Sequence, residues 1–138
     1  MWIAYALISA VFAAAVAILG KIGLKTVDTT LATAIRAAVM GIFMISAALI
    51  LGKLPMLKTV DNKTLLFIIY SGIAGALSWL FYFFALKYGP ASGVAALDRL
   101  SVVFVVILAA LFLGEAITLK SGIGLAFIIS GALLLVFK

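Results

Sequence analysis

The sequence predicts an all-α membrane protein with five transmembrane helices. Hydrophobic residues make up 68% of the 138-residue chain and charged residues only 10%, whereas a soluble domain carries about 25% charged residues. Long apolar segments follow one another, separated by short polar connectors. Each is close to the roughly 20 residues that an α-helix needs to cross a hydrocarbon core about 30 Å thick. We therefore expect a single membrane domain over residues 1–138.

Local signals mark the ends of the expected helices. The first helix starts almost at the N-terminus, without the basic region of a cleaved signal peptide, and we expect it to be retained. Asp28 or Thr29 can cap the second helix and Asp61 the third, because their side-chain oxygens accept hydrogen bonds from free N–H groups of the first turn. Pro90 is pre-set for the first turn of the fourth helix, and Thr118 can cap the fifth. The expected helices span residues 2–24, 29–51, 63–87, 91–113 and 118–137.

Two missing residue types narrow the function classes. The chain contains no Cys, which excludes disulfides and Cys-ligated metals, and no His, the usual general base and the commonest metal ligand. We therefore expect no enzyme, no metal site and no other cofactor. The net charge of +6 would suggest nucleic acid in a soluble protein. Here most lysines lie in connectors and at helix ends, where they anchor helices to anionic lipid headgroups, so no nucleic-acid partner is expected.

The lysines give no clear membrane orientation. An odd number of helices places the termini on opposite sides, and the lysines are then evenly divided between the sides, although Lys/Arg asymmetry in short loops normally sets orientation. Two copies could therefore pair antiparallel and form the inverted repeat that larger transporters carry within one chain. A helper protein or the lipid composition fixing one orientation is the alternative. The N-terminal side carries Lys53, Lys58, Lys63 and Lys120, and the other side Lys21, Lys25, Lys87 and Lys138.

Three ionisable residues lie well inside the apolar segments. Arg36 is about seven residues into the second helix, and Asp98 and Arg99 are about seven residues into the fourth. All three are therefore expected roughly 10 Å from the same membrane side. Each costs at least about 2.5–3.5 kcal/mol there and is expected to face the bundle interior or a water-filled cavity. We expect Asp98 to pair with Arg36, either as an internal clamp or as a gate or substrate contact, with Arg99 snorkelling or lining the cavity.

The third helix carries a polar face near its middle. Gly75, Ser78 and Tyr82 follow helical spacing, and Trp79 lies beside them. Trp normally lies at the membrane interface, so a Trp near the middle of a span indicates a cavity or tight packing. We expect Ser78, Trp79 and Tyr82 to line a cavity, with Ser9 of the first helix as a weaker candidate.

The last helix carries two glycines, Gly124 and Gly131, seven residues apart and thus on one face. Small residues allow the backbones of two membrane helices to approach closely. We expect a contact at these glycines, within the chain or between two chains.

Three stretches of the second half form a recognisable pattern. They are residues 87–97 (KYGPASGVAAL), residues 100–104 (LSVVF) followed by Leu113-Gly114-Glu115, and residues 122–133 (GIGLAFIISGAL). Together they resemble the EamA domain of the drug/metabolite transporter superfamily, and the number and length of the helices match over the whole chain. Most members carry two five-helix units in tandem. The single unit here is similar to the short bacterial and archaeal branch.

The resemblance implies a multi-pass transporter of small metabolites in the cell membrane, the inner membrane of a prokaryote, working by alternating access. In that fold the first four helices of a unit line the cavity, so one unit would need a partner copy in a homodimer. The last helix is also similar to the dimerisation stretch of the small multidrug resistance proteins, which implies a dimer contact at Gly124 and Gly131.

Those multidrug proteins carry a membrane-embedded Glu in their first helix, and the first helix here has no carboxylate. We therefore do not expect proton-coupled export of hydrophobic cations. An anionic or amphipathic small molecule is the expected substrate, and membrane lipids are the surrounding partner. Two other functions stay open: a non-transporting membrane partner subunit, and a flippase for a lipid or glycolipid.

Overall fold

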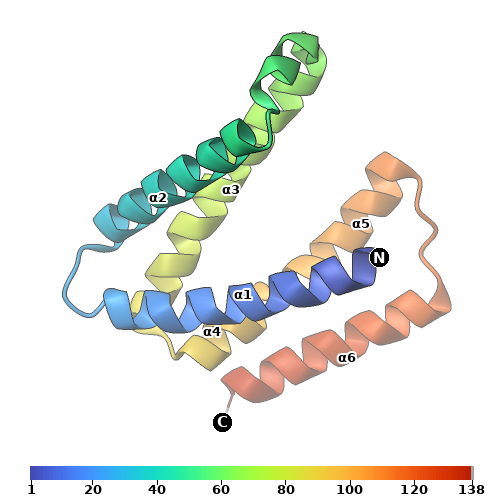
Figure 1. Ribbon diagram of the computed structural model, residues 1–138. Coiled ribbons are helices and arrows are strands. Elements are labelled where there is room, and N and C mark those ends of the chain that lie inside the picture. The colour runs from blue at the N-terminus through green and yellow to red at the C-terminus, as the bar shows by residue number, and fades with distance from the viewer. Residues whose placement is uncertain (138) are drawn as a thin grey trace. The chain divides into compact units, whose positions relative to one another are not determined.

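Helices make up nearly all of the regular structure of this chain (Figure 1). The computed structural model describes residues 1–137, and Lys138, counted above among the lysines of the C-terminal side, lies outside the described residues. No strand occurs within residues 1–137. Five segments are long and apolar enough to cross a membrane, which confirms the predicted fold class. They are Trp2–Gly23, Thr29–Ile50, Asn62–Tyr88, Ala91–Leu113 and Leu119–Val136.

The helix ends agree with the expected ends to within one residue, apart from a break inside the fourth span. A short 3₁₀ helix also lies in the connector between the second and third spans. The elements are α1 (Trp2–Gly23), α2 (Thr29–Ile50), η1 (Leu54–Thr59), α3 (Asn62–Tyr88), α4 (Ala91–Asp98), α5 (Ser101–Leu113) and α6 (Leu119–Val136).

The continuous helix expected over residues 91–113 is interrupted between Asp98 and Ser101. The Leu100 N–H donates to the Leu97 carbonyl oxygen at 2.9 Å, and the Val103 N–H donates to the Leu100 carbonyl oxygen at 2.9 Å. These bonds join residues three apart, as in a 3₁₀ turn, and a tightened turn inside a helix often marks a functional hinge. The fourth span thus consists of two helical pieces, α4 and α5.

Side-chain caps begin three of the helices as the sequence indicates. The Leu31 N–H donates to Asp28 at the start of α2 at 3.0 Å. The Thr64 N–H donates to Asp61 before α3 at 3.1 Å. Thr118 caps α6, with Ser121 bonding back to the Thr118 N–H in a capping box. Hydrogen bonds from the side chain and the backbone N–H of Thr64 lower the pKa of Asp61.

The chain divides into two compact units, and the prediction of one membrane domain stays a prediction. Unit 1 consists of Met1–Lys21 and Tyr88–Lys138. Within it, the start of α4 packs closely against the end of α6, because a Cβ atom at Gly93 would lie 3.3 Å from Pro90 Cγ and 3.8 Å from Val136 Cγ2. The Lys21 Nζ donates to the Gly89 carbonyl oxygen at 2.8 Å and ties the end of α1 to the connector before α4.

Unit 2 consists of Ile22–Lys87. In it α2 and α3 run antiparallel and are joined through η1 (Figure 1). Its buried side chains gather at the opposite end, where the connector before α2 meets the end of α3: Leu24 is 2% exposed and Leu86 0%, and Thr29 and Phe83 are also buried. This small core holds α2 and α3 together at the end opposite η1.

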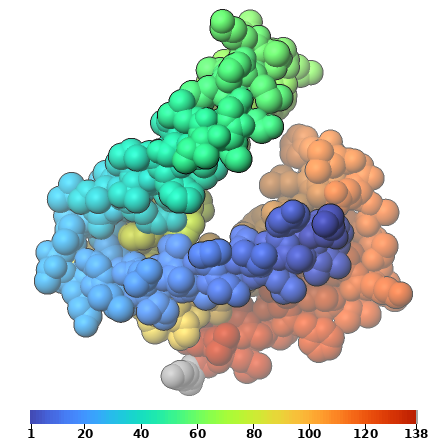
Figure 2. Space-filling view, viewed as in Figure 1, coloured from blue at the N-terminus to red at the C-terminus, as the bar shows by residue number. Residues whose placement is uncertain are grey.

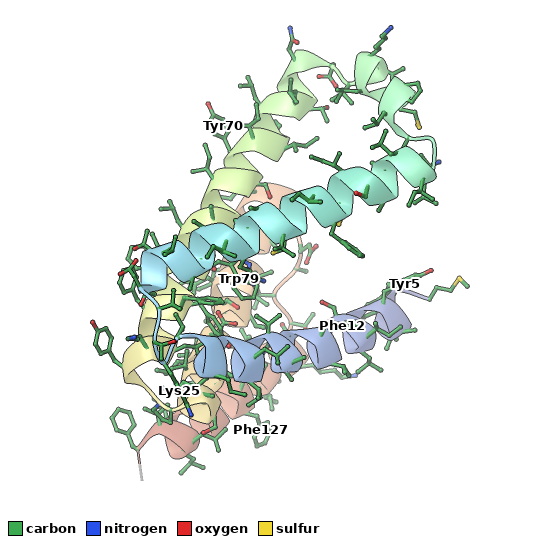
Figure 3. The ribbon with its side chains drawn as sticks, turned by 60° about the vertical axis from the view of Figure 1, so that its left-hand side comes forward. Tyr5, Phe12, Lys25, Tyr70, Trp79 and Phe127 are labelled. Atoms are coloured by element: carbon green, nitrogen blue, oxygen red, sulfur yellow. The ribbon has the colours of Figure 1, made fainter. Side chains whose placement is uncertain are left out.

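Large apolar side chains cover the outer surface of the spans. Ile42, Phe43 and Ile45 of α2 are all more than half exposed, and Figure 2 shows the surface that α2 and η1 present, in cyan to green. Tyr70 projects outward from α3 in Figure 3. Apolar exposure on this scale marks a surface that contacts lipid rather than water.

Candidate functional site

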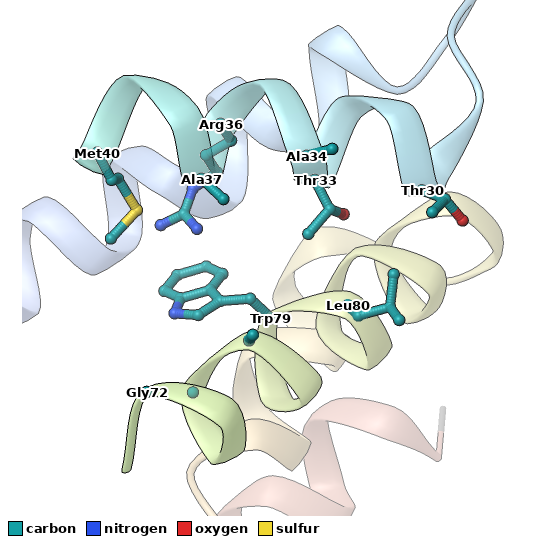
Figure 4. A pocket seen from close by; sticks show the side chains of 11 residues that line it. Thr30, Thr33, Ala34, Arg36, Ala37, Met40, Gly72, Trp79 and Leu80 are labelled. Atoms are coloured by element: carbon teal, nitrogen blue, oxygen red, sulfur yellow. The ribbon is translucent and has the colours of Figure 1, made fainter. Parts of the chain in front are cut away.

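A groove of about 490 Å³ lies between α2 and α3 within unit 2 (Figure 4). This volume falls in the range of about 300–1,000 Å³ that is typical of small-molecule sites. From α2 the lining residues are Thr30, Thr33, Ala34, Arg36, Ala37 and Met40, and from α3 they are Gly72, Gly75, Ala76, Trp79 and Leu80.

The Arg36 guanidinium lies over the indole of Trp79 and joins the two helices (Figure 4). The Arg36 Cζ atom is 3.6 Å from the Trp79 ring centroid and 5.6 Å from the Phe83 ring centroid. Cation–π contacts of this kind contribute about 0.5–2 kcal/mol. That is less than the roughly 2.5–3.5 kcal/mol or more that a guanidinium costs inside a span. The aromatic contact therefore offsets only part of the cost, and an anion would stabilise the site further.

Neighbouring aromatic rings hold Trp79 in position. The Tyr82 ring meets the indole edge-on, with centroids 5.5 Å apart, and the Phe83 centroid is 6.1 Å away. These rings follow Trp79 by three and four residues, so they lie one turn further along the same side of α3. Phe83 is 4% exposed and belongs to the small core of unit 2. The indole thus contacts the buried core of unit 2 through Phe83.

Glycines keep the groove open on the α3 side. A Cβ atom built at Gly72 or at Gly75 would meet no atom within 4 Å. Counted back from Trp79, Ala76, Gly75 and Gly72 lie three, four and seven residues away, which is one helix face. The small residues on the Trp79 face therefore leave space for a ligand rather than a close helix contact.

Arg36 is the one charged side chain among the residues that line the groove. The two carboxylates of unit 2, Asp28 and Asp61, accept backbone hydrogen bonds at helix starts. Within residues 1–137, no cluster of three or more His, Cys, Asp or Glu side chains could hold a metal ion. The groove thus offers one fixed positive charge in an otherwise apolar lining.

The structure brings together two of the predicted site residues, Arg36 and Trp79. Tyr82 contacts Trp79 without lining the groove, and Ser78 is exposed and is not a lining residue. The expected Arg36–Asp98 pair would join the two units and stays a prediction. The cavity roles of Ser9, Asp98 and Arg99, which belong to unit 1, also stay predictions.

Unit 1 contains a smaller hollow of about 310 Å³ between the fourth span and α6. Arg99 and Gly131 both line it, and a Cβ atom at the half-buried Gly131 would meet no atom within 4 Å. Gly124 is exposed, and a Cβ atom there would meet nothing within 4 Å. Gly124 is the more exposed of the two glycines, and a dimer contact at either glycine stays a prediction. The hollow is lined by Ala96, Arg99, Val102, Phe127, Ile128, Gly131, Ala132 and Leu135.

Sequence reasoning missed Thr30, Thr33, Met40 and Gly72 as lining residues. For Gly72 a signal was present, since it lies two helical turns before Trp79 on the same face. The positions on α2 carry no such signal, because Thr and Met are common throughout membrane helices and nothing local shows which face meets α3.

One protein family matches nearly the whole chain. The model of the EamA-like transporter family matches residues 1–137. The chain belongs to the EamA-like transporter family. A relative from a Sinorhizobium species, named "Uncharacterized transporter in cobO 3'region", is 42% identical over 134 residues, which cover 97% of this chain and 95% of the relative. No solved structure matches the chain with significance.

Family membership confirms the resemblance carried by the second half of the sequence. With its five spans, this EamA protein is a multi-pass membrane transporter of small molecules. Its place in the cell membrane and its lack of enzymatic activity remain predictions.

Proposed function

We propose that this EamA protein moves a small molecule across the cell membrane by alternating access and binds it in the groove between α2 and α3. The observation that carries the proposal is the Arg36 guanidinium, 3.6 Å from the Trp79 ring centroid inside two membrane spans. An ionisable side chain at this depth usually faces the bundle interior or a water-filled cavity and marks a functional site.

The depth of the pair supports a binding role over an anchoring one. Arg36 follows the first residue of α2, Thr29, by seven positions, which places its backbone roughly 10 Å along the helix. An Arg near a helix end extends its head group to the interface. Here the guanidinium instead lies on an indole that belongs to α3, so its charge stays inside the spans.

The break in the fourth span is the proposed moving element. Broken helices in transporters place charged groups and backbone dipoles along the substrate path. The break directly follows Asp98 and contains Arg99. We propose that these two residues and Ser9, all in unit 1, and Ser78 and Tyr82, in unit 2, contact the substrate along its path across the membrane.

A homodimer would complete the path, because this chain with its five membrane helices corresponds to half of the usual tandem arrangement of the family. The even division of the lysines allows the two copies to insert in opposite orientations. Gly124 on the exposed face of α6 is the proposed contact, with Gly131 as its neighbour two turns away.

Counterflow in liposomes tests the proposal. The purified protein would be reconstituted with a preloaded panel of amino acids, nucleosides and organic anions, and exchange of labelled compound would be followed. We expect at least one compound to exchange with the wild type and exchange to fall with Arg36→Gln. Exchange that is equally fast with Arg36→Gln would contradict the assignment of the site. A folded protein that binds ligands in the groove but exchanges none would instead indicate the partner subunit.

A further inference from the structure

We infer that the groove between α2 and α3 selects amphipathic monoanions, meaning compounds with one carboxylate, an apolar body and no ammonium group. The inference rests on the proposed function, of which it describes the binding step. It follows from three properties of the groove: the free edge of the guanidinium, the balance of charge, and the apolar lining.

The stacked guanidinium of Arg36 still has its hydrogen-bond donors to offer. Contact with Trp79 uses the flat face of the guanidinium, whereas its five N–H groups lie in the plane of the fork. The structure records no hydrogen bond to this side chain among the described residues. A carboxylate can therefore accept two parallel hydrogen bonds from the edge of the fork, the strongest arrangement available to this side chain.

The charge balance of the groove excludes a second charge on the ligand. The lining residues include one cation and no anion. An ammonium group in the groove would lack a counter-charge and would be repelled by Arg36, and a buried charge without a partner is strongly unfavourable. A second carboxylate would likewise stay unpaired. Zwitterions, cations and dianions should therefore bind more weakly than a monoanion with the same carbon skeleton.

The rest of the lining favours an apolar body. Apart from Arg36, the Trp79 indole N–H and two threonines, the groove consists of glycine, alanine, leucine and methionine. The Thr33 hydroxyl donates to the Thr29 carbonyl oxygen at 2.8 Å, so its proton is already used. A sugar or another polyol would leave several hydroxyls unpaired in this setting, at a cost for each. An alkyl or aromatic body has no hydroxyl groups that would be left unpaired in the groove.

The depth of Arg36 favours a soluble ligand over a lipid. The phosphate of a lipid lies in the headgroup region outside the hydrocarbon core. The guanidinium is held on Trp79 rather than extended toward the interface. A short carboxylic acid can enter with its whole head group, whereas the headgroup of an anionic lipid would have to leave the interface.

Intrinsic fluorescence provides a binding assay that is independent of transport. The chain has two tryptophans, so Trp2→Phe leaves Trp79 as the sole reporter, directly against the guanidinium. The probes would be hexanoate, norleucine, hexylamine and hexanol, which share an unbranched six-carbon skeleton and differ in charge. In phosphatidylcholine nanodiscs we expect a saturable fluorescence change with hexanoate. Norleucine and hexylamine should bind at least about tenfold more weakly, and hexanol should give only non-saturable partitioning.

Two kinds of variant locate the binding. Arg36→Gln should abolish the preference for hexanoate over norleucine. Because a change at Arg36 could also disturb folding, Gly75→Leu provides a second test: its side chain fills open space in the groove and should block hexanoate without lowering the melting temperature. Gly41→Leu on α2, also at a position with open space but not a lining residue, is the matched control and should bind hexanoate as the wild type does.

Each outcome decides for or against the inference. Equal affinity for hexanoate and norleucine, or hexanoate binding that persists in Gly75→Leu, would overturn it. Hexanoate binding could be lost in nanodiscs that contain phosphatidylglycerol and return when that lipid is left out. This result would assign the anion site to a lipid and overturn the inference of a soluble ligand. Saturable hexanoate binding without any counterflow would support the inference while contradicting the proposed transport. Counterflow of other compounds without hexanoate binding would support the proposed transport and contradict the inference.

Discussion

The Lys87 Nζ atom, at the end of α3, donates a hydrogen bond of 2.7 Å to the Leu24 carbonyl oxygen in the connector before α2. It also donates to the Val27 carbonyl oxygen at 3.4 Å. The lysine that the sequence suggests as a lipid anchor therefore also holds a connector in place. Leu24 itself is 2% exposed, so the same short segment supplies both an apolar core residue and a polar attachment.

Lys87→Met should lower the stability of unit 2, because it keeps the apolar stem and removes the charged donor. Hydrogen bonds to charged groups contribute about 1.5–3 kcal/mol, and the loss should appear as a lower thermal midpoint in detergent. Lys58→Met on the exposed surface of η1 is the control, with an expected change within about 0.5 kcal/mol. Equal losses from the two substitutions would contradict the role given to Lys87.

Trp79 substitutions should reduce ligand affinity in a graded order. Trp79→Phe keeps a smaller aromatic face beneath Arg36, and Trp79→Leu removes the face altogether. With a cation–π contribution of about 0.5–2 kcal/mol, affinity should fall by a factor of about 2 to 30 in the Leu variant and less in the Phe variant. Counterflow of a compound that the wild type exchanges provides the measurement. Trp2→Phe, outside the groove, should leave exchange unchanged, and a flat response across the Trp79 series would exclude the stacking role.

Gly93→Leu should separate the start of α4 from the end of α6. A Cβ atom at this position already lies 3.3 Å from Pro90 Cγ, and a longer side chain would extend toward Val136. Overpacking of this kind typically costs about 1–3 kcal/mol. Gly122→Leu on α6, where a Cβ atom meets nothing within 4 Å, is the matched control and should be tolerated. Chemical denaturation of the two variants in mixed micelles would test this difference.

Asp61 should make the start of α3 sensitive to acid. Its pKa lies below the ordinary value of 3.8, chiefly because the side chain and the backbone N–H of Thr64 donate to the carboxylate. A lowered pKa means that the ionised form stabilises the folded state above the unfolded-state pKa and that this contribution is lost as the pH falls through the folded-state value. Asp61→Asn keeps a capping side chain but cannot ionise. The thermal midpoint of the wild type should therefore fall more steeply below pH 4 than that of the variant, and parallel curves would exclude the effect.

The spans and their caps could be predicted from the sequence because both depend on short segments. Length and hydropathy define a membrane helix without reference to its neighbours, and the caps at Asp28, Asp61 and Thr118 involve residues three positions away. The break after Asp98 could not be predicted, since residues 95–103 contain neither glycine nor proline.

Two residues of the candidate groove, Arg36 and Trp79, could be singled out from the sequence, for a reason specific to membrane proteins. A charge and a tryptophan deep in apolar helices are costly or unusual, so Arg36 and Trp79 could be singled out individually. Which face of α3 meets α2 could not be determined, because a helix in lipid is apolar on every side and its periodicity does not indicate the interior. The sequence suggested Gly75, Ser78 and Tyr82 beside Trp79, whereas the groove is lined by Gly72, Gly75 and Ala76 beside Trp79. The cavity roles of Ser78 and Tyr82 stay predictions.

Because the space beside Gly72 and Gly75 is open, the size of the molecule that fits the groove can be changed without changing the folding of the protein. Carbon atoms added at either position take volume from the bound molecule without displacing a neighbouring side chain. In the proposed binding mode, single substitutions there would shorten the accepted molecule stepwise, while Arg36, which is proposed to bind its head group, stays in place.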